Sequence, residues 1–240
     1  MPENIRPEDI LFLDIETVPA VPSFDMLEEH MKELWEKKSA QFRTGEQTAG
    51  TVYDRAAIYA EFGKIICISA GVFTGRDPFR FRLKSFFGDD EKEILSDFSL
   101  MLNRFARSRE SQLCAHNGKE FDYPYLARRM VINRLVIPEM LNIAGKKPWE
   151  VKLLDTMELW KFGDFRSFVS LDLLTSVLGL PSPKDDIRGS EVGEVYWNSH
   201  DITRIVTYCE KDVLAVARIL LRLMNLGEID DDGVESVTNS

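Results

Sequence analysis

The chain has 240 residues, a formal net charge of −10 and 44% hydrophobic residues. The length suits one large domain or two small ones, and the composition is ordinary for a soluble globular fold. We expect neither a signal peptide nor a membrane segment, because Met1–Asp9 is polar and acidic and no apolar run is long enough to span a bilayer. The negative charge argues against tight binding of duplex DNA through its phosphates.

The three cysteines suggest a reducing compartment. Cys67, Cys114 and Cys209 are odd in number, and none belongs to a C-x-x-C or Cys/His metal pattern. Each lies in an apolar stretch, as reduced core thiols do. We therefore expect a cytoplasmic protein.

The first predicted strand is the stretch Ile10–Thr17, in which four apolar residues run directly into two acids. A run that is apolar on both faces indicates a strand in the middle of a sheet. Asp14 and Glu16 are two residues apart, so both carboxylates leave the strand from the same face. Such neighbouring anions need a cation or hydrogen-bond donors. The alternative, an Asp that starts a turn beside a solvated Glu, remains open on this stretch alone.

A long connection, residues 19–62, follows the first strand. It contains a predicted amphipathic helix over Phe24–Phe42 and a second, shorter helical piece over Tyr53–Glu61. Connections of this length are commonly functional, although a tolerated surface insertion is an equal alternative.

The next elements alternate strands with helices. They are strands over Lys64–Phe73 and Phe79–Phe87, a helix capped by Asp89 or Asp90 that runs to about Arg107, a strand over Gln112–His116 and a helix over Tyr125–Asn133.

The C-terminal half continues this α/β pattern. It comprises a strand followed by a helix over Lys152–Phe162, a helix over Leu171–Leu178 capped by Ser170, a polar loop over Pro181–Gly193, a long helix over Ile202–Met224 and an acidic tail over 227–240 that we expect to be disordered. The pattern predicts a mixed sheet flanked by helices in a single domain, residues 1–226.

The long last helix carries acids close to its buried face. Its apolar stripe consists of Ile205, Cys209, Val213, Val216, Leu220 and Met224. At about 100° per residue, Asp212 points close to the direction of that stripe, and Tyr208 lies one turn earlier on the same side. An acid in this position needs a partner, and a cation shared with Asp14 and Glu16 would serve.

Asp122 allows two interpretations. It precedes a helix with proline at an early position, which favours an N-cap. It also follows the strand Gln112–His116, so it reaches the edge that presents Asp14 and Glu16 if that strand is parallel to the first. The two roles can coexist.

Three motifs now occur in a specific order: D-I-E-T at Asp14–Thr17, N-x-x-x-F-D at Asn117–Asp122 and Y-x-x-x-D at Tyr208–Asp212. Together they resemble the 3′–5′ exonuclease domains of the DnaQ-like (DEDD) superfamily, in its tyrosine-containing subgroup. The chain is most similar to the proofreading domains of family B DNA polymerases and their predicted stand-alone relatives. The stretch Ser170–Gly179 also resembles the helix before the third motif. The chain departs from the pattern of these domains in its long 19–62 connection and in the absence of a polymerase region.

This resemblance implies a ribonuclease H-like α/β fold with a mixed five-stranded sheet, and two divalent cations, Mg²⁺ or Mn²⁺. Asp14 would contact both cations, Glu16 and Asp212 would hold the one that activates water, and Asp122 would help to hold the second. Tyr208 would orient the attacking water. A sparse set of carboxylates suits Mg²⁺, and no cluster of His or Cys argues for zinc.

Other residues would contact the substrate. The resemblance assigns Thr17, Asn117 and Phe121 to the terminal nucleotide or its pocket, and Phe121 is equally well explained as a core residue. His116 is interpreted as structural, because the tyrosine takes the water-side position in this subgroup. Basic side chains could guide a strand, but most are expected to be solvated: Arg128, Arg129, Arg134, Lys146, Lys147, Lys161 and Arg166.

The predicted function is a 3′–5′ exonuclease that releases nucleoside 5′-monophosphates from single-stranded DNA 3′ ends, in DNA repair or proofreading. The alternatives are a 3′–5′ exoribonuclease and, from another class, a catalytically inert module that binds nucleic acid. No membrane partner is expected, and the sequence does not indicate a protein partner. The inserted segment is expected to cover the site and to limit which 3′ ends enter.

Overall fold

The computed structural model describes residues 6–106, 110–147, 150–164, 166–183 and 186–238. Arg107, the expected end of one helix, and the last two residues of the tail lie outside these ranges. Within them, no helix is both long enough and apolar enough to cross a membrane.

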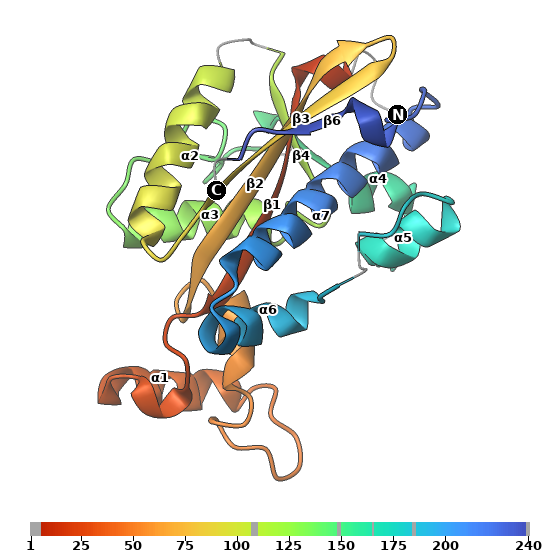
Figure 1. The fold of residues 1–240 in the computed structure, drawn as a ribbon. Coiled ribbons are helices and arrows are strands. Elements are labelled where there is room, and N and C mark those ends of the chain that lie inside the picture. Colours follow the sequence, from red (N-terminus) through yellow and green to blue (C-terminus); the bar gives the residue numbers. More distant parts are fainter. Residues whose placement is uncertain (1–5, 107–109, 148–149, 165, 184–185, 239–240) are drawn as a thin grey trace.

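A mixed sheet of six strands in the order β5-β4-β1-β2-β3-β6 forms the centre of the molecule (Figure 1). Its strands are β1 (Ile10–Pro19), β2 (Gly63–Arg76), β3 (Phe79–Phe87), β4 (Gln112–Ala115), β5 (Leu153–Asp155) and β6 (Val234–Ser236). β2 runs antiparallel to β1, whereas β4 runs parallel to it. The carboxyl ends of β1 and β4 therefore lie at the same edge of the sheet.

The sixth strand corrects two expectations, the five-stranded sheet and the disordered tail. β6 pairs with β3 in parallel, and Ile229 before it is buried with 4% of its surface exposed. The Glu210 carboxylate accepts hydrogen bonds from the hydroxyl groups of Ser236 and Thr238. Pairing with the open edge of β3 satisfies backbone groups that a short acidic segment could not satisfy alone.

Alternate side chains of β1 enter two different cores. One core, under α2 and α3, receives Leu11, Leu13 and Ile15. Ile10 and Phe12 instead join the core under α7. Because side chains two residues apart leave a strand from the same face, Asp14 and Glu16 emerge on the α7 side.

Helices cover both faces of the sheet (Figure 1). One face is covered by α2 (Glu91–Phe105) and α3 (Asp122–Ile132), and the other by α4 (Thr156–Lys161), α5 (Leu171–Val177) and α7 (Ile202–Leu223). Asp90 and Ser170 cap α2 and α5 as expected, and the side chains of Asp155 and Asp201 likewise accept backbone N–H groups of the first turns of α4 and α7. Between α5 and α7 lie α6 (Val192–Glu194) and a π-helical turn (Val195–Ser199).

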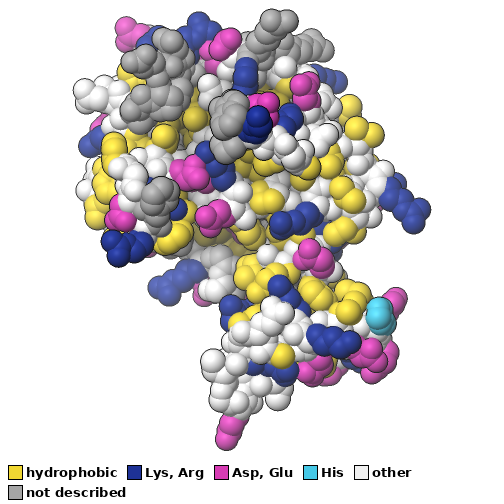
Figure 2. Space-filling view, turned by 180° about the vertical axis from the view of Figure 1, so that it is seen from behind, with side chains coloured by type: hydrophobic (Ala, Val, Ile, Leu, Met, Phe, Trp, Pro, Cys, Tyr) yellow, Lys and Arg dark blue, Asp and Glu magenta, His cyan; other side chains and the backbone are white. Residues whose placement is uncertain are grey.

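Residues 20–62 form a small lobe below the body (Figures 1 and 2). It contains α1 (Glu29–Ser39), shorter than the expected helix, and a 3₁₀ helix at Tyr53–Ile58. The fully buried Trp35 centres its own aromatic core, with ring centroids 5.6 Å from Tyr53 and 5.2 Å from Phe62. The lobe therefore has a packed core separate from those of the sheet.

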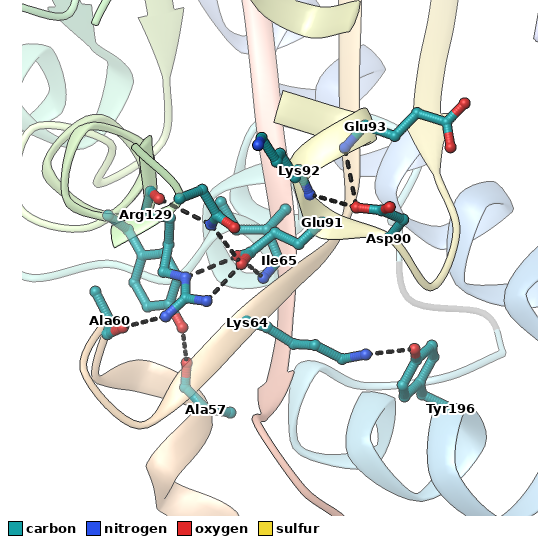
Figure 3. A network of polar contacts seen from close by, with 12 residues as sticks. Ala57, Ala60, Lys64, Ile65, Asp90, Glu91, Lys92, Glu93, Arg129 and Tyr196 are labelled. Carbon is teal, nitrogen blue, oxygen red and sulfur yellow. Dashed lines mark hydrogen bonds and ion pairs between the residues drawn. The ribbon is translucent and has the colours of Figure 1, made fainter. Parts of the chain in front are cut away.

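A polar network joins the base of the lobe to the body (Figure 3). The Arg129 guanidinium forms an ion pair with Glu91 and donates from Nη1 to the Ala60 carbonyl at 2.7 Å. Glu91 also accepts the Ile65 backbone N–H at 2.7 Å. Both charged side chains are largely buried, so the end of the lobe is held against α2, α3 and the start of β2.

Candidate active site

Asp14 is the centre of an acidic cluster at the edge of the sheet. Part of its surface is open to solvent, but burial of its carboxyl raises the Asp14 pKa well above the usual value. The negative charges of Asp212, Asp122 and Glu16 raise it further. The other three acids that the sequence predicted are therefore close enough to Asp14 for their charges to repel its carboxylate.

α7 contributes two of the predicted residues, one turn apart. Asp212 and Tyr208 are buried, with 7% and 6% of their surfaces exposed. The Tyr208 hydroxyl donates a hydrogen bond to Asp212, and burial followed by the charges of Asp212, Glu16 and Asp14 raises the Tyr208 pKa. The hydroxyl therefore keeps its proton at neutral pH.

Cys209, which the sequence placed only in the apolar stripe, belongs to the same cluster. Its thiol donates to the Asp14 carboxylate, with 3.4 Å between Sγ and Oδ2. One potential ligand atom from each of Asp14, Glu16 and Cys209 lies within 4.8 Å of the other two. The signal in the sequence was its position directly after Tyr208, but the contact depends on β1 lying across α7.

Asp122 reaches the cluster from the start of α3. It is the first residue of the helix rather than its cap, because Phe121 takes the cap position. Burial, opposed by backbone hydrogen bonds from its own N–H and that of Ile15, raises the Asp122 pKa to about 7, and the charges of Asp155 and Asp212 add to the rise. β1 and β4 run parallel, and this arrangement brings Asp122 to the same edge of the sheet as Asp14. The prediction that Asp122 joins the acids depended on that arrangement.

Asp155 is a second residue that sequence reasoning missed. Its carboxylate caps α4 and also accepts the backbone N–H groups of Asn117 at 2.9 Å and Lys119 at 3.1 Å. These bonds fix the turn between β4 and α3, in which Asn117 adopts a positive φ of 62°. The sequence signal was an acid directly before a helical pattern.

The three predicted substrate contacts lie in different environments. Asn117 lines a cavity of about 390 Å³, and its buried Oδ1 has no hydrogen-bond donor among the described residues. Phe121 packs against the Tyr125 ring at 5.3 Å, which favours its core interpretation. Thr17 donates to the Tyr125 hydroxyl oxygen and lines a separate cavity beside the lobe.

The structural interpretation of His116 fits its contacts. Its ring nitrogens lie 2.9 Å from the Thr156 hydroxyl and 2.9 Å from the Val169 carbonyl. Among the basic candidates, Arg129 is used in the ion pair with Glu91, and Lys161 lies over the Phe168 ring at 4.2 Å.

These features define a ribonuclease H-like α/β fold, with carboxylates from β1, α3 and α7 at one edge of the sheet. The fold is similar to that of the family B DNA polymerase from the hyperthermophilic archaeon Pyrobaculum calidifontis, with a TM-score of 0.56 and 13% identity. The match covers 90% of this chain and 24% of the polymerase, so the chain spans about a quarter of that protein. Among curated proteins, none matches the chain.

The chain belongs to the family described as "Predicted 3'-5' exonuclease related to the exonuclease domain of PolB", whose model matches residues 58–239. The match includes Asp122, Tyr208 and Asp212, whereas Asp14 and Glu16 precede it. The resemblance to polymerase exonuclease domains is confirmed, and the tyrosine subgroup stays a prediction.

Proposed function

We propose that the chain is a metal-dependent 3′–5′ exonuclease that hydrolyses single-stranded DNA 3′ ends to nucleoside 5′-monophosphates, in DNA repair or proofreading. The observation that carries the proposal is the convergence of Asp14, Glu16, Asp122 and Asp212: burial raises the pKa of Asp14, and the charges of the other three acids raise it further. Family membership supports the reaction class.

The donor set fits hard divalent cations. Carboxylate oxygens are the protein ligands of Mg²⁺ and Mn²⁺, and carboxylates in mutual repulsion gain most from a shared cation. Asp14 would contact both ions, Glu16 and Asp212 would hold one, and Asp122 would help to hold the other. When bound, such a pair would activate water and stabilise charge on the attacking and leaving oxygens.

The other side chains would position the substrate. Tyr208 keeps its proton, so its hydroxyl, fixed by Asp212, would orient the water rather than deprotonate it. The buried Oδ1 of Asn117 would accept a hydrogen bond from the terminal nucleotide. Thr17 and Phe121 would shape the nearby surface.

A cleavage assay tests this function. Single-stranded DNA, duplex DNA and RNA, each labelled at the 5′ end, are incubated with and without Mn²⁺ and resolved on a gel. We expect a ladder that shortens from the 3′ end of single-stranded DNA only when Mn²⁺ is present. Faster cleavage of RNA would establish the exoribonuclease alternative, and no cleavage of any strand would contradict both. Asp97→Ala, an exposed acid on α2, is the matched control for Asp14→Ala.

A further inference from the structure

A cleft of about 720 Å³ lies between the lobe and the segment that precedes α7. The lobe contributes one wall, including Phe24, Tyr53 and Arg55, and residues 189–198 contribute the other. Thr17, directly after the acids of β1, lies on the cleft surface. The cleft has the size of a site for a small organic group.

The cleft opens beside the acidic cluster. A Cβ added to Gly189, which lines it, would lie 3.9 Å from the Tyr208 hydroxyl oxygen. If a phosphate of a nucleic-acid strand lay at the acids, the neighbouring nucleotides of that strand would therefore reach the cleft.

Both walls are held in place by contacts with the body. On the lobe side, the Tyr125 hydroxyl donates to the Ala57 carbonyl at 2.8 Å, next to the Arg129 contact with Ala60 (Figure 3). On the other side, Lys64 Nζ donates to the Tyr196 hydroxyl oxygen at 2.8 Å (Figure 3). The cleft is thus preformed, which lowers the entropic cost of binding.

The lining suits a neutral aromatic group. Phe24 and Trp197, both partly exposed, offer ring surfaces, and the buried indole N–H of Trp197 has no hydrogen-bond acceptor in the part of the chain that the structure describes. The charged residues of the lining are Arg55, Asp54 and Glu194, so no excess of positive charge would attract a phosphate. A heteroaromatic ring with hydrogen-bond acceptors matches this surface better than a phosphate does.

We propose that this cleft binds one unpaired nucleobase, from the last or second-last nucleotide of the strand whose 3′ end lies at the acids. The inference rests on the proposed function and adds what the lobe does. A base paired in a duplex must be unpaired and unstacked before it can enter, which opposes the binding of duplex ends. The lobe would thereby favour single-stranded ends.

Strands that lack one base test the inference. Four 5′-labelled DNA strands with phosphorothioate linkages at the 3′ end are compared by fluorescence anisotropy in Mn²⁺: an intact strand and strands abasic at the last, second-last or third-last position. Stacking of a single base is worth about 1–3 kcal/mol, so loss of the bound base should weaken binding about 10-fold. We expect this loss at one of the last two positions only.

Two variants connect that loss to the cleft. Ser190→Trp fills the cleft from an exposed position, and Ser199→Trp, exposed in the same segment but outside the lining, is its control. Ser190→Trp should bind the intact strand about 10-fold more weakly than the wild type does, and its affinity should not fall further when the base is missing. Ser199→Trp should behave as the wild type. Asn198→Ala, which removes only a polar group of the lining, should weaken the intact strand without filling space.

The outcomes separate the two proposals. If the wild type cleaves ordinary strands but binds all four test strands equally, the cleft inference is wrong and the exonuclease proposal stands. The inference is also wrong if Ser190→Trp binds the intact strand as tightly as the wild type does. It is wrong as well if the affinity of Ser190→Trp falls about 10-fold further when the base is missing. If no strand is bound or cleaved, both proposals fail.

Discussion

Cys209 and Asp14, 195 positions apart in the chain, are joined by a hydrogen bond of 3.4 Å from the thiol to the carboxylate. The same sulfur lies 3.5 Å from the Asp14 carbonyl oxygen, so it contacts both the backbone and the side chain of β1. The contact links α7 to the strand that carries two of the acids, and from it we predict that Cys209 positions the Asp14 carboxylate.

Cys209→Ala should weaken Mn²⁺ binding and lower kcat/KM, each by about 5- to 10-fold, because one hydrogen bond to a charged group is lost. Cys209→Ser keeps a donor and should recover most of both. Calorimetric titration with Mn²⁺, together with steady-state rates, measures the two effects. A purely structural cysteine would instead give variants with altered thermal stability and unchanged Mn²⁺ affinity.

Asp14→Ala and Asp212→Ala should each lower the rate of cleavage by about 10³-fold or more, since loss of a metal ligand removes several kcal/mol of transition-state stabilisation. Circular dichroism should show an intact fold. Full activity of either variant with Mg²⁺ present would remove that residue from the mechanism.

Tyr208→Phe should slow turnover by about 10²-fold with little change in KM, the usual scale for a positioned proton-transfer group. The raised Tyr208 pKa implies that the rate shows no tyrosine ionisation between pH 6 and about 9. Single-turnover rates across this range provide the measurement. An unchanged rate at every pH would show that the hydroxyl does not act on the water.

The metal-free protein should become less stable as the pH rises. The Asp122 pKa is about 7 in the fold and 3.8 ordinarily, so the folded state holds its proton more tightly. Its stabilising contribution is complete below about pH 4 and is lost as the pH rises through about 7, amounting to about 4 kcal/mol in total. Asp14 acts in the same direction.

Urea unfolding in EDTA at several pH values measures this loss. Asp122→Asn removes the titrating group, so the variant should lose less free energy of unfolding between pH 5 and 8 than the wild type loses. Saturating Mn²⁺ should remove this decrease in the free energy of unfolding with pH in the wild type. If the free energy of unfolding fell equally with pH in the wild type and in Asp122→Asn, both in EDTA, the raised pKa would not belong to Asp122.

Arg129→Met should lower the free energy of unfolding by about 3 kcal/mol, because Glu91 would keep a buried charge without its cation. The double variant Glu91→Gln, Arg129→Met should be less destabilised than the sum of the single changes. Arg222→Met breaks an exposed pair with Glu228 and should change stability by less than about 1 kcal/mol. Equal effects of Arg129→Met and Arg222→Met would contradict the importance of burial.

Much of the site could be predicted from local patterns. A strand alternates its faces, which placed Asp14 and Glu16 on one side, and helical periodicity placed Asp212 at the margin of a buried stripe. Both predictions needed only the geometry of a single element. The parallel arrangement of β1 and β4 was a condition for Asp122, and the structure meets it.

The features that were missed depend on contacts between distant segments. β6 is three residues long, and its existence depends on the open edge of β3, about 150 residues earlier. The thiol of Cys209 looked like part of an apolar stripe because no local pattern reveals that β1 lies above it. The cleft beside the lobe likewise requires the folded positions of Thr17, Tyr53 and Trp197.

The most direct test of the acidic cluster is a calorimetric titration of the protein with Mn²⁺ in the presence of a nucleoside 5′-monophosphate. We predict two bound ions for the wild type and the loss of at least one in Asp14→Asn and in Asp212→Asn, with Asp97→Asn unchanged. Identical isotherms for the wild type and both site variants would contradict a metal centre formed by these carboxylates.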